Sequence, residues 1–336
     1  MLSEDDQVKV NIITPADDQL ETEIKDTKDG KYTVTYTPRC VGQHRVEIQV
    51  NGQPLTGSPW LVQVISSHQY QFAFQFGSKG KEQGQFDKSW GIAVNDKSRT
   101  LAVADVSNKR VQMFDFDGNF LREIVPEGRT SSVAFTESGD LLSNVQSDDN
   151  KITLYLYTEG GQFIRYISDE HVKAPWYVSV GSDGRIITCD YDDKTIKVLS
   201  PDGKNIFQSF RAPGCDVGPW CVVYQQDKFF VSYPEANRVM VFNNAGEYLY
   251  DIGSKGSGDG QLWFPIGLAI DKFNRLIVCD RNNDRLQLFT LDGKYVAKVA
   301  GSFFDHNSYV VGCAVSNTGH LFVTDNNNHC IYVFNY

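Results

Sequence analysis

The stretch "VADVSNKRVQMFDFDGNFL" (residues 103–121) decides the fold, because its plan recurs along the chain. Apolar and polar residues alternate around Asp105, and Asp117-Gly118 then offers a two-residue turn, which predicts a strand, a loop, a second strand and a turn. Three further copies follow the same plan: "IITCDYDDKTIKVLSPDGKNI" (186–206), "IVCDRNNDRLQLFTLDGKYV" (277–296) and "FVTDNNNHCIYVFNY" (322–336). Their aspartates are Asp190, Asp280 and Asp325.

Two degenerate copies fill the gaps, with Asn144 and Ser232 in place of the aspartate. The six key positions are spaced by 39, 46, 42, 48 and 45 residues. A period of about 40–50 residues built from short strands is typical of a β-propeller. We therefore predict an all-β chain with a six-bladed propeller over residues 67–336. Longer loops and looser packing are expected in the two degenerate blades.

The last copy ends at Tyr336 and lacks a fourth strand. A spare strand stands before the first blade, where "YQFAFQFGSKG" (70–80) resembles the end of the fourth blade, "YLYDIGSKGSGDGQ" (248–261). We predict that residues 70–76 pair into the last blade and close the ring, because closure removes two exposed strand edges.

Residues 1–66 lack the repeat and consist of short alternating segments, which indicate a β-sandwich. The wording "DGKYTVTYTPRCVGQHRVEIQVNGQPLTGSPWLVQV" (29–64) resembles a filamin-type immunoglobulin-like domain. About five of the seven strands of such a domain are recognisable. We expect a partial domain that lacks its first strands, and a chain that begins inside a domain of a longer protein.

The pattern Asp-x-x-Asn-x-Arg-Val, as in Asp105 to Val111, together with "SKGKEQGQF" (78–86) before an opening strand, resembles the NHL repeat. A filamin-type domain followed by six NHL repeats is similar to the C-terminal half of TRIM-NHL proteins. The resemblance implies a parent protein with a RING domain, B-boxes and a coiled coil, acting as an E3 ubiquitin ligase. None of these parts belongs to the residues printed above.

Composition limits the remaining function classes. Hydrophobic residues make up 41% of the chain, yet no apolar run approaches the roughly 18–20 residues that span a bilayer. The acidic start "MLSEDDQVKV" is no signal peptide, and the seven cysteines show no metal-ligand spacing. These features predict a cytoplasmic protein with reduced thiols, no cofactor and no membrane partner.

The recurring aspartates Asp105, Asp190, Asp280 and Asp325 allow two interpretations. In the first, a carboxylate at the entrance to a tight loop accepts hydrogen bonds from backbone N–H groups and pairs with an arginine. Arg110 lies five residues after Asp105, and Arg285 lies five residues after Asp280. The alternative is a ring of metal-binding carboxylates. We favour the structural role, because the aspartate recurs in four blades, whereas a protein with a metal centre needs only one such site.

Catalysis is not predicted for this chain. No histidine occupies a matching position in two blades, and no His-x-His or His-x-x-x-His pattern occurs. The glycine-rich "GSKGSGDGQ" (253–261) leads into another strand rather than a helix, so it is no phosphate loop. We therefore expect a binding module with no small-molecule substrate and no bound metal.

One propeller face is expected to carry recognition, because the loops between blades and the loops between second and third strands emerge there together. The predicted face residues are Lys88, Trp90, Lys109, Arg129, Lys173, Trp176, Arg211, Trp220, Tyr233, Arg281 and Tyr309. Aromatic rings interleaved with cations suit unpaired RNA bases and phosphates. The tryptophans could equally wedge neighbouring blades together, with the charges solvated.

Two functions stay open for this face. It binds single-stranded or hairpin RNA and represses messages, or it binds proteins such as ubiquitylation substrates, cytoskeletal proteins or motors. The resemblance to TRIM-NHL proteins implies both. The net charge of −10 argues against unspecific nucleic-acid binding over the whole surface but leaves one basic face possible. We favour RNA slightly.

Overall fold

The computed structural model describes residues 7–28, 31–38, 40, 42–64, 69–167, 172–299, 303–304 and 308–336. The chain forms two compact units, residues 1–68 and 69–336. The predicted boundary between residues 66 and 67 lies outside the described residues.

The first unit is a small β-sandwich of two sheets. Its five predicted strands are present, together with two short ones: β1 (Val8–Ile13), β2 (Gln19–Leu20), β3 (Thr22–Asp26), β4 (Tyr32–Tyr36), β5 (Gly42–Val50), β6 (Gln53–Pro54) and β7 (Trp60–Val64). One sheet has the order β2-β1-β5-β6, with β7 also pairing β5, and β3 pairs with β4 in the other. Val10, Ile12 and Leu20 form its buried core.

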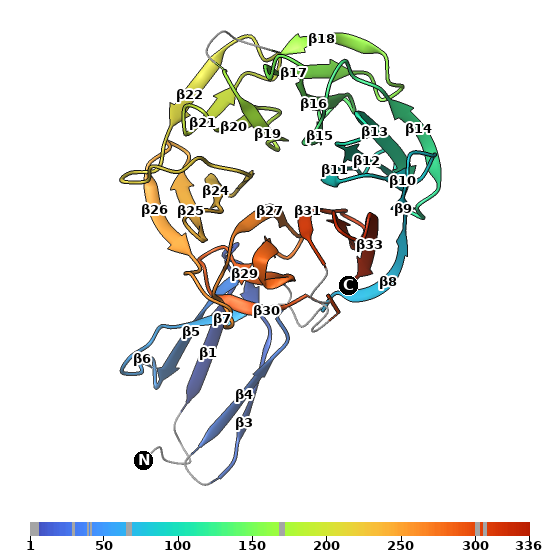
Figure 1. The fold of residues 1–336 in the computed structure, drawn as a ribbon. Coiled ribbons are helices and arrows are strands. Elements are labelled where there is room, and N and C mark those ends of the chain that lie inside the picture. The colour runs from blue at the N-terminus through green and yellow to red at the C-terminus, as the bar shows by residue number, and fades with distance from the viewer. Residues whose placement is uncertain are drawn as a thin grey trace. The chain divides into compact units, whose positions relative to one another are not determined.

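The second unit is a six-bladed propeller, in which four-stranded antiparallel sheets are arranged in a ring around a central axis (Figure 1). Blade 1 consists of β11 (Ser89–Asn95), β12 (Thr100–Asp105), β13 (Arg110–Asp115) and β14 (Phe120–Ile124). Blade 2 consists of β15 (Val133–Phe135), β16 (Leu141–Gln146), β17 (Ile152–Tyr157) and β18 (Phe163–Ile167). Blade 3 consists of β19 (Pro175–Val180), β20 (Ile186–Asp190), β21 (Thr195–Leu199) and β22 (Ile206–Phe210).

Blades 4 and 5 continue the same pattern, and blade 6 takes its outer strand from the start of the unit. Their strands are β23 (Val222–Gln225), β24 (Lys228–Tyr233), β25 (Arg238–Asn243) and β26 (Tyr248–Ile252); β27 (Pro265–Ile270), β28 (Arg275–Asp280), β29 (Arg285–Thr290) and β30 (Tyr295–Lys298); β31 (Val310–Val315), β32 (His320–Asp325), β33 (Cys330–Asn335) and β8 (Gln71–Phe76). A two-stranded parallel pair, β9 (Ser78–Lys79) and β10 (Gln85–Phe86), lies before blade 1, and a 3-10 turn, η1 (Arg281–Asn283), follows β28.

The core lies between the blades rather than within one sheet. Side chains alternate along each strand, so a middle strand contacts both neighbouring blades: Leu276 and Val278 of β28 pack toward blade 4, whereas Ile277 and Cys279 pack toward blade 6. Among the described residues, six such apolar clusters follow one another around the ring. This two-sided burial explains why the second strands are nearly continuous apolar runs instead of alternating ones.

The ring closes through β8 and β33, which pair antiparallel with Phe76 opposite Ile331 and Phe74 opposite Val333. Phe74 and Phe76 also pack against the apolar cluster shared with blade 1. The outer strand of blade 6 therefore comes from the opposite end of the propeller chain, and this pairing ties both ends of the unit together.

Candidate functional site

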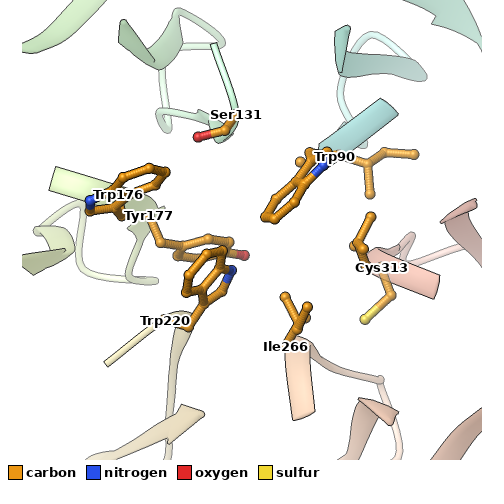
Figure 2. A pocket seen from close by; sticks show the side chains of 12 residues that line it. Trp90, Ser131, Trp176, Tyr177, Trp220, Ile266 and Cys313 are labelled. Carbon is orange, nitrogen blue, oxygen red and sulfur yellow. The ribbon is translucent and has the colours of Figure 1, made fainter. Parts of the chain in front are cut away.

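Six residues, one from each blade, are among those that line a pocket at the centre of the propeller ring. We call them the mouth ring: Trp90, Ser131, Trp176, Trp220, Ile266 and Val311. Figure 2 shows three indole rings converging on this opening from different blades. The Trp220 ring centroid lies 5.5 Å from that of Trp90 and 5.8 Å from that of Trp176. The three half-buried rings form a continuous aromatic surface.

Glycines behind the mouth ring allow neighbouring inner strands to approach closely. Gly91, Gly267 and Gly312 each follow a ring residue directly. A Cβ added at Gly312 would lie 2.4 Å from the Trp90 carbonyl oxygen, and one at Gly91 would lie 2.6 Å from the Ser131 carbonyl oxygen. The Gly91 N–H uses this space to donate to the Ser131 carbonyl at 3.0 Å. The positions of the ring side chains thus depend on direct contact between inner strands.

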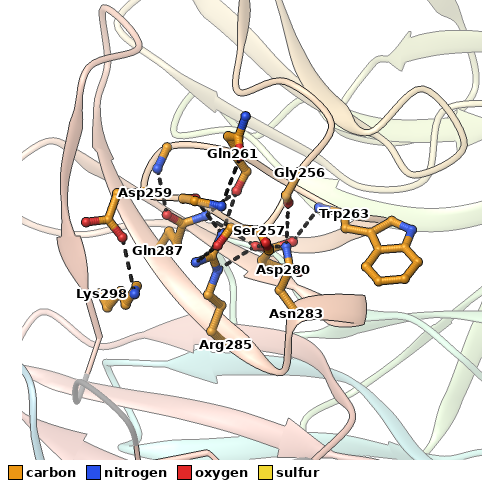
Figure 3. Close-up of polar contacts among 12 residues, drawn as sticks. Gly256, Ser257, Asp259, Gln261, Trp263, Asp280, Asn283, Arg285, Gln287 and Lys298 are labelled. Atoms are coloured by element: carbon orange, nitrogen blue, oxygen red, sulfur yellow. Dashed lines mark hydrogen bonds and ion pairs between the residues drawn. The ribbon is translucent and has the colours of Figure 1, made fainter.

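The repeat aspartates hold the loops that frame the ring. Asp280 Oδ1 accepts the Trp263 N–H at 2.6 Å, which fixes the loop that enters blade 5. Its Oδ2 accepts from Asn283 at 2.8 Å and from Arg285 at 2.7 Å, which fixes the loop after β28 (Figure 3). Burial raises the pKa of Asp280 above its ordinary value, although these donors favour the charged form. One carboxylate therefore joins two loops.

Asp105 makes the equivalent contacts in blade 1. It accepts the Asp87 N–H at 2.7 Å, Asn108 at 2.8 Å and Arg110 Nε at 2.9 Å. Asp325 likewise accepts the Tyr309 N–H at 3.0 Å. These carboxylates accept hydrogen bonds from N–H groups on both loops, which is the anchoring role.

The arginine partners extend this anchoring to the glycine-rich loops. Arg285 donates to the carbonyl oxygens of Ser257, Gly258 and Gln261 at 2.8–2.9 Å. Arg110 donates in the same manner to the carbonyls of Glu82 and Gln85. Blade 3 has no arginine at this place. There, Lys197 Nζ lies 2.7 Å from Asp190, whose carboxylate also accepts the Lys173 N–H.

The degenerate blades use other side chains for similar contacts. Asn144 Oδ1 accepts the N–H groups of Ser131 and Ser132, and its Nδ2 donates to the Trp176 carbonyl at 2.9 Å. The Ser232 hydroxyl donates to the Ile266 carbonyl at 2.7 Å and accepts the Cys221 N–H. Both side chains are buried. The expectation of looser packing is therefore wrong at these two positions.

We predict that Asp280→Ala lowers the free energy of unfolding by about 1–3 kcal/mol, because the Trp263 N–H and the Arg285 guanidinium lose a buried acceptor. The matched change Asp292→Ala removes an exposed turn carboxylate paired with Lys294 and should cost within about 0.5 kcal/mol. Chemical denaturation of both variants measures the difference. Equal losses would show that Asp280 is not an anchor.

The loops of the predicted face meet in the structure. The Val106 N–H donates to the Lys88 carbonyl, and the Tyr191 N–H donates to the Ala174 carbonyl, so second-to-third-strand loops bond to inter-blade loops. Three predicted cations are paired with carboxylates: Lys109 with Asp148 at 3.0 Å, Lys173 with Asp193 at 3.0 Å and Arg211 with Asp216 at 3.6 Å. Lys88 and Arg129 are exposed and form no ion pair within the part of the chain that the structure describes.

Tyr233 does not belong to this face. Its side chain is fully buried in the cluster between blades 3 and 4, beside Cys189, Ala212 and Cys215. The prediction of Tyr233 as a ligand contact was wrong, because the loop that enters blade 4 encloses it. Tyr191, the equivalent residue of blade 3, lies at the ring instead, with its centroid 6.1 Å from Trp220.

Arg281 and Tyr309 come together on this face with Phe264, which is not among the predicted face residues. The Arg281 guanidinium carbon lies 3.9 Å above the centre of the Tyr309 ring and 4.9 Å above that of Phe264. The neighbouring Trp263 is 47% exposed. Trp263 has no matching tryptophan in other blades, and the only sequence signal for it is its place two residues before β27, the opening strand of blade 5.

The comparisons with known proteins agree with this architecture. Residues 2–61 match the Filamin/ABP280 repeat, residues 215–309 match a six-bladed β-propeller family, and residues 308–334 match the NHL repeat. The E3 ubiquitin-protein ligase TRIM71 of Rattus norvegicus is 34% identical over 123 residues, which is 35% of this chain and 14% of that protein. The chain is homologous to TRIM-NHL proteins.

Two other TRIM-NHL relatives are similar at the same level. Protein lin-41 of Caenorhabditis elegans is 32% identical over 34% of this chain and 10% of its own length. Protein brain tumor of Drosophila melanogaster is 30% identical over 42% of this chain and 14% of its own length. The aligned part thus spans about a seventh or less of these relatives.

Solved structures share the fold at low identity. A protein of unknown function from Bacteroides thetaiotaomicron has a TM-score of 0.65 and 18% identity, covering 98% of this chain and 90% of that one. Streptogramin B lyase has a TM-score of 0.57 and 13% identity, covering 78% of this chain and 98% of that one. At such identities the likeness concerns the fold alone.

A search of the described residues for membrane-spanning helices finds none with the length and apolar character that a bilayer requires.

Proposed function

We propose that this TRIM-NHL homologue recognises a segment of a protein partner with the mouth-ring face of its propeller. One observation supports this above others: tryptophans from three different blades converge on one half-buried pocket. Protein interfaces concentrate their binding energy in tryptophan, tyrosine and arginine side chains near a desolvated centre. The mouth ring supplies such a centre.

The charges around the ring favour a protein over RNA. Residues 67–336 carry 26 lysines and arginines against 32 aspartates and glutamates. Three of the six predicted face cations are paired with carboxylates of the same loop or an adjacent one. An RNA-binding face needs unneutralised positive charge along the phosphate path, whereas a polar rim of mixed sign around an apolar centre is typical of protein interfaces.

RNA remains the second candidate, because of two residues. Lys88 and Arg129 stand at equivalent places, two residues before Trp90 and Ser131, and both are exposed. They would put two cations beside an aromatic surface on which bases stack. By homology, the parent protein would act as a cytoplasmic E3 ubiquitin ligase, with this face selecting either substrates or messages.

The test compares Trp220→Ala with Phe207→Ala, a change at a 60% exposed aromatic residue on the outer strand β22 of blade 3. We expect Trp220→Ala to weaken binding of protein-derived peptides about thirtyfold, or about 2 kcal/mol, because it removes the central ring of the cluster. Phe207→Ala should leave the affinity unchanged. Peptides selected from a random library on the full chain serve as ligands.

A salt titration with a random 12-nucleotide RNA pool separates the two candidates. RNA recognition predicts a steep loss of affinity with salt, and Lys88→Gln and Arg129→Gln should each flatten the log–log slope by about 0.7, because each removes one phosphate-binding cation. Protein recognition predicts no RNA binding tighter than about 100 μM at physiological salt, the weak end of non-specific affinity. Tight, salt-dependent RNA binding together with failure to select any peptide would replace the protein proposal with the RNA one.

A further inference from the structure

Arg281 is an uncommitted cation held in a defined orientation. Its guanidinium packs against the rings of Tyr309 and Phe264. Its Nε is buried without a hydrogen-bond partner, and among the described residues the guanidinium forms no ion pair. Burial lowers the pKa of Arg281, so this charge is partly desolvated. A desolvated cation attracts an anion more strongly than one in open water does.

The other arginines of the repeat differ from it. Arg285, four residues later, directs its N–H groups to Asp280 and to three loop carbonyls (Figure 3). Arg110 does the same in blade 1. These donors hold the loops in place. The planar fork of Arg281 is oriented by aromatic packing alone, which leaves its donors available to a ligand.

The backbone of the repeat places one of the two rings. Phe264 has a left-handed φ of 61°, and its N–H donates to Asn237 Oδ1 of blade 4 at 3.1 Å. Lys88 has a φ of 62° at the equivalent place in blade 1. Blades 1 and 5 therefore share this conformation, and blade 5 uses it to present an aromatic ring to Arg281 instead of a cation.

We propose that Arg281, framed by Phe264 and Tyr309, binds the carboxylate of an aspartate or glutamate in the protein segment that the mouth ring recognises. This proposal rests on the proposed function above. A planar guanidinium matches a carboxylate with two parallel hydrogen bonds. Arg285, four residues later, is paired with Asp280, so Arg281 itself brings one positive charge to the site, which suits a monoanion better than a phosphate dianion.

The anion site and the ring are within reach of one short segment. Phe264 precedes the ring residue Ile266 by two residues, a step of roughly 7 Å along a strand. Tyr309 precedes Val311 by the same step. Trp263, half-exposed beside Phe264, adds apolar surface. The expected ligand is an extended segment with an apolar or aromatic residue at the ring and an acidic residue a few positions away.

The test selects peptides from a random 12-residue library on the full chain and measures the best binder. We expect an acidic residue to recur beside an apolar one in the selected peptides. Arg281→Gln should lower the affinity about 10- to 100-fold, and replacing the peptide's acid by its amide should have the same effect. The two changes combined should weaken binding little more than either alone, because both remove the same interaction. Arg281→Lys should recover part of the affinity.

The outcomes separate this inference from the proposed function. Peptides that lose affinity with Trp220→Ala but not with Arg281→Gln would overturn the carboxylate site and leave protein recognition intact. Failure of the library to yield any binder would overturn both. A 12-nucleotide RNA pool, bound by wild type and released by Arg281→Gln while no acidic peptide binds, would assign the site to phosphate. Circular dichroism checks that each variant stays folded.

Discussion

Deleting β8 (residues 71–76) from the full chain is expected to abolish cooperative unfolding of the propeller. The deletion removes the outer strand of blade 6, exposes the edge of β33 and takes Phe72, Phe74 and Phe76 out of their apolar contacts. Losing the half-buried Phe74 and Phe76, together with the whole backbone pairing to β33, should cost more than about 5 kcal/mol, which is comparable with the whole stability of a domain.

Differential scanning calorimetry and binding of a hydrophobic dye measure this effect. Wild type should show one sharp transition for the propeller, and the deletion variant a broad one with raised dye binding. A synthetic peptide of residues 69–78, added in excess, should restore the sharp transition, whereas a scrambled peptide should not. If the deletion variant melts as sharply as wild type, β8 does not complete the ring.

Gly312→Val is expected to destabilise the propeller by about 3 kcal/mol or more, because the new side chain meets backbone rather than a flexible side chain. A Cβ at this position would lie 2.4 Å from the Trp90 carbonyl oxygen and 2.9 Å from Thr324 Oγ1. Thr324 Oγ1 donates to that same carbonyl at 2.7 Å, so the clash also breaks the hydrogen bond between blades 6 and 1.

The control is Gly160→Ala, at an exposed turn where the added Cβ would meet only Thr158 Oγ1 at 3.5 Å. Its stability should stay within about 0.5 kcal/mol of wild type. Urea denaturation gives both values, and tryptophan fluorescence of the native state reports whether the mouth ring has moved. A Gly312→Val protein with unchanged stability and fluorescence would show that the inner strands are free to move apart.

Local features of the fold were predictable, because they depend on short-range sequence. The recurrence of Asp105, Asp190, Asp280 and Asp325 indicated the blades, and the family comparisons confirm the six-bladed propeller and the filamin repeat. An aspartate at the entrance to a loop and an arginine five residues later belong to one hairpin, so the ion pair between them is a local interaction. Such an interaction needs no knowledge of neighbouring blades.

The recognition face was only partly predictable, because contacts between blades decide it. Tyr191 and Tyr233 follow equivalent key positions, yet one lies at the mouth ring and the other is buried by the loop that enters blade 4. Lys109 forms an ion pair with Asp148, which lies 39 residues later in the sequence. That pairing neutralises a cation on which the RNA interpretation depended. The repeat period of the sequence does not indicate which loops of neighbouring blades are in contact.

By itself, the sequence determined the class of the fold, the number of blades and the aspartates that anchor the loops of four blades, since these follow from strand period and from interactions within a hairpin. Only the tertiary structure decided which side chains share a surface. Trp90, Trp176 and Trp220 meet because ring closure brings separate blades around one central axis, and Arg281 acquires its aromatic frame because Tyr309 comes from the next blade. Burial and charge pairing are properties of neighbours in space, and closure of the ring sets those neighbours.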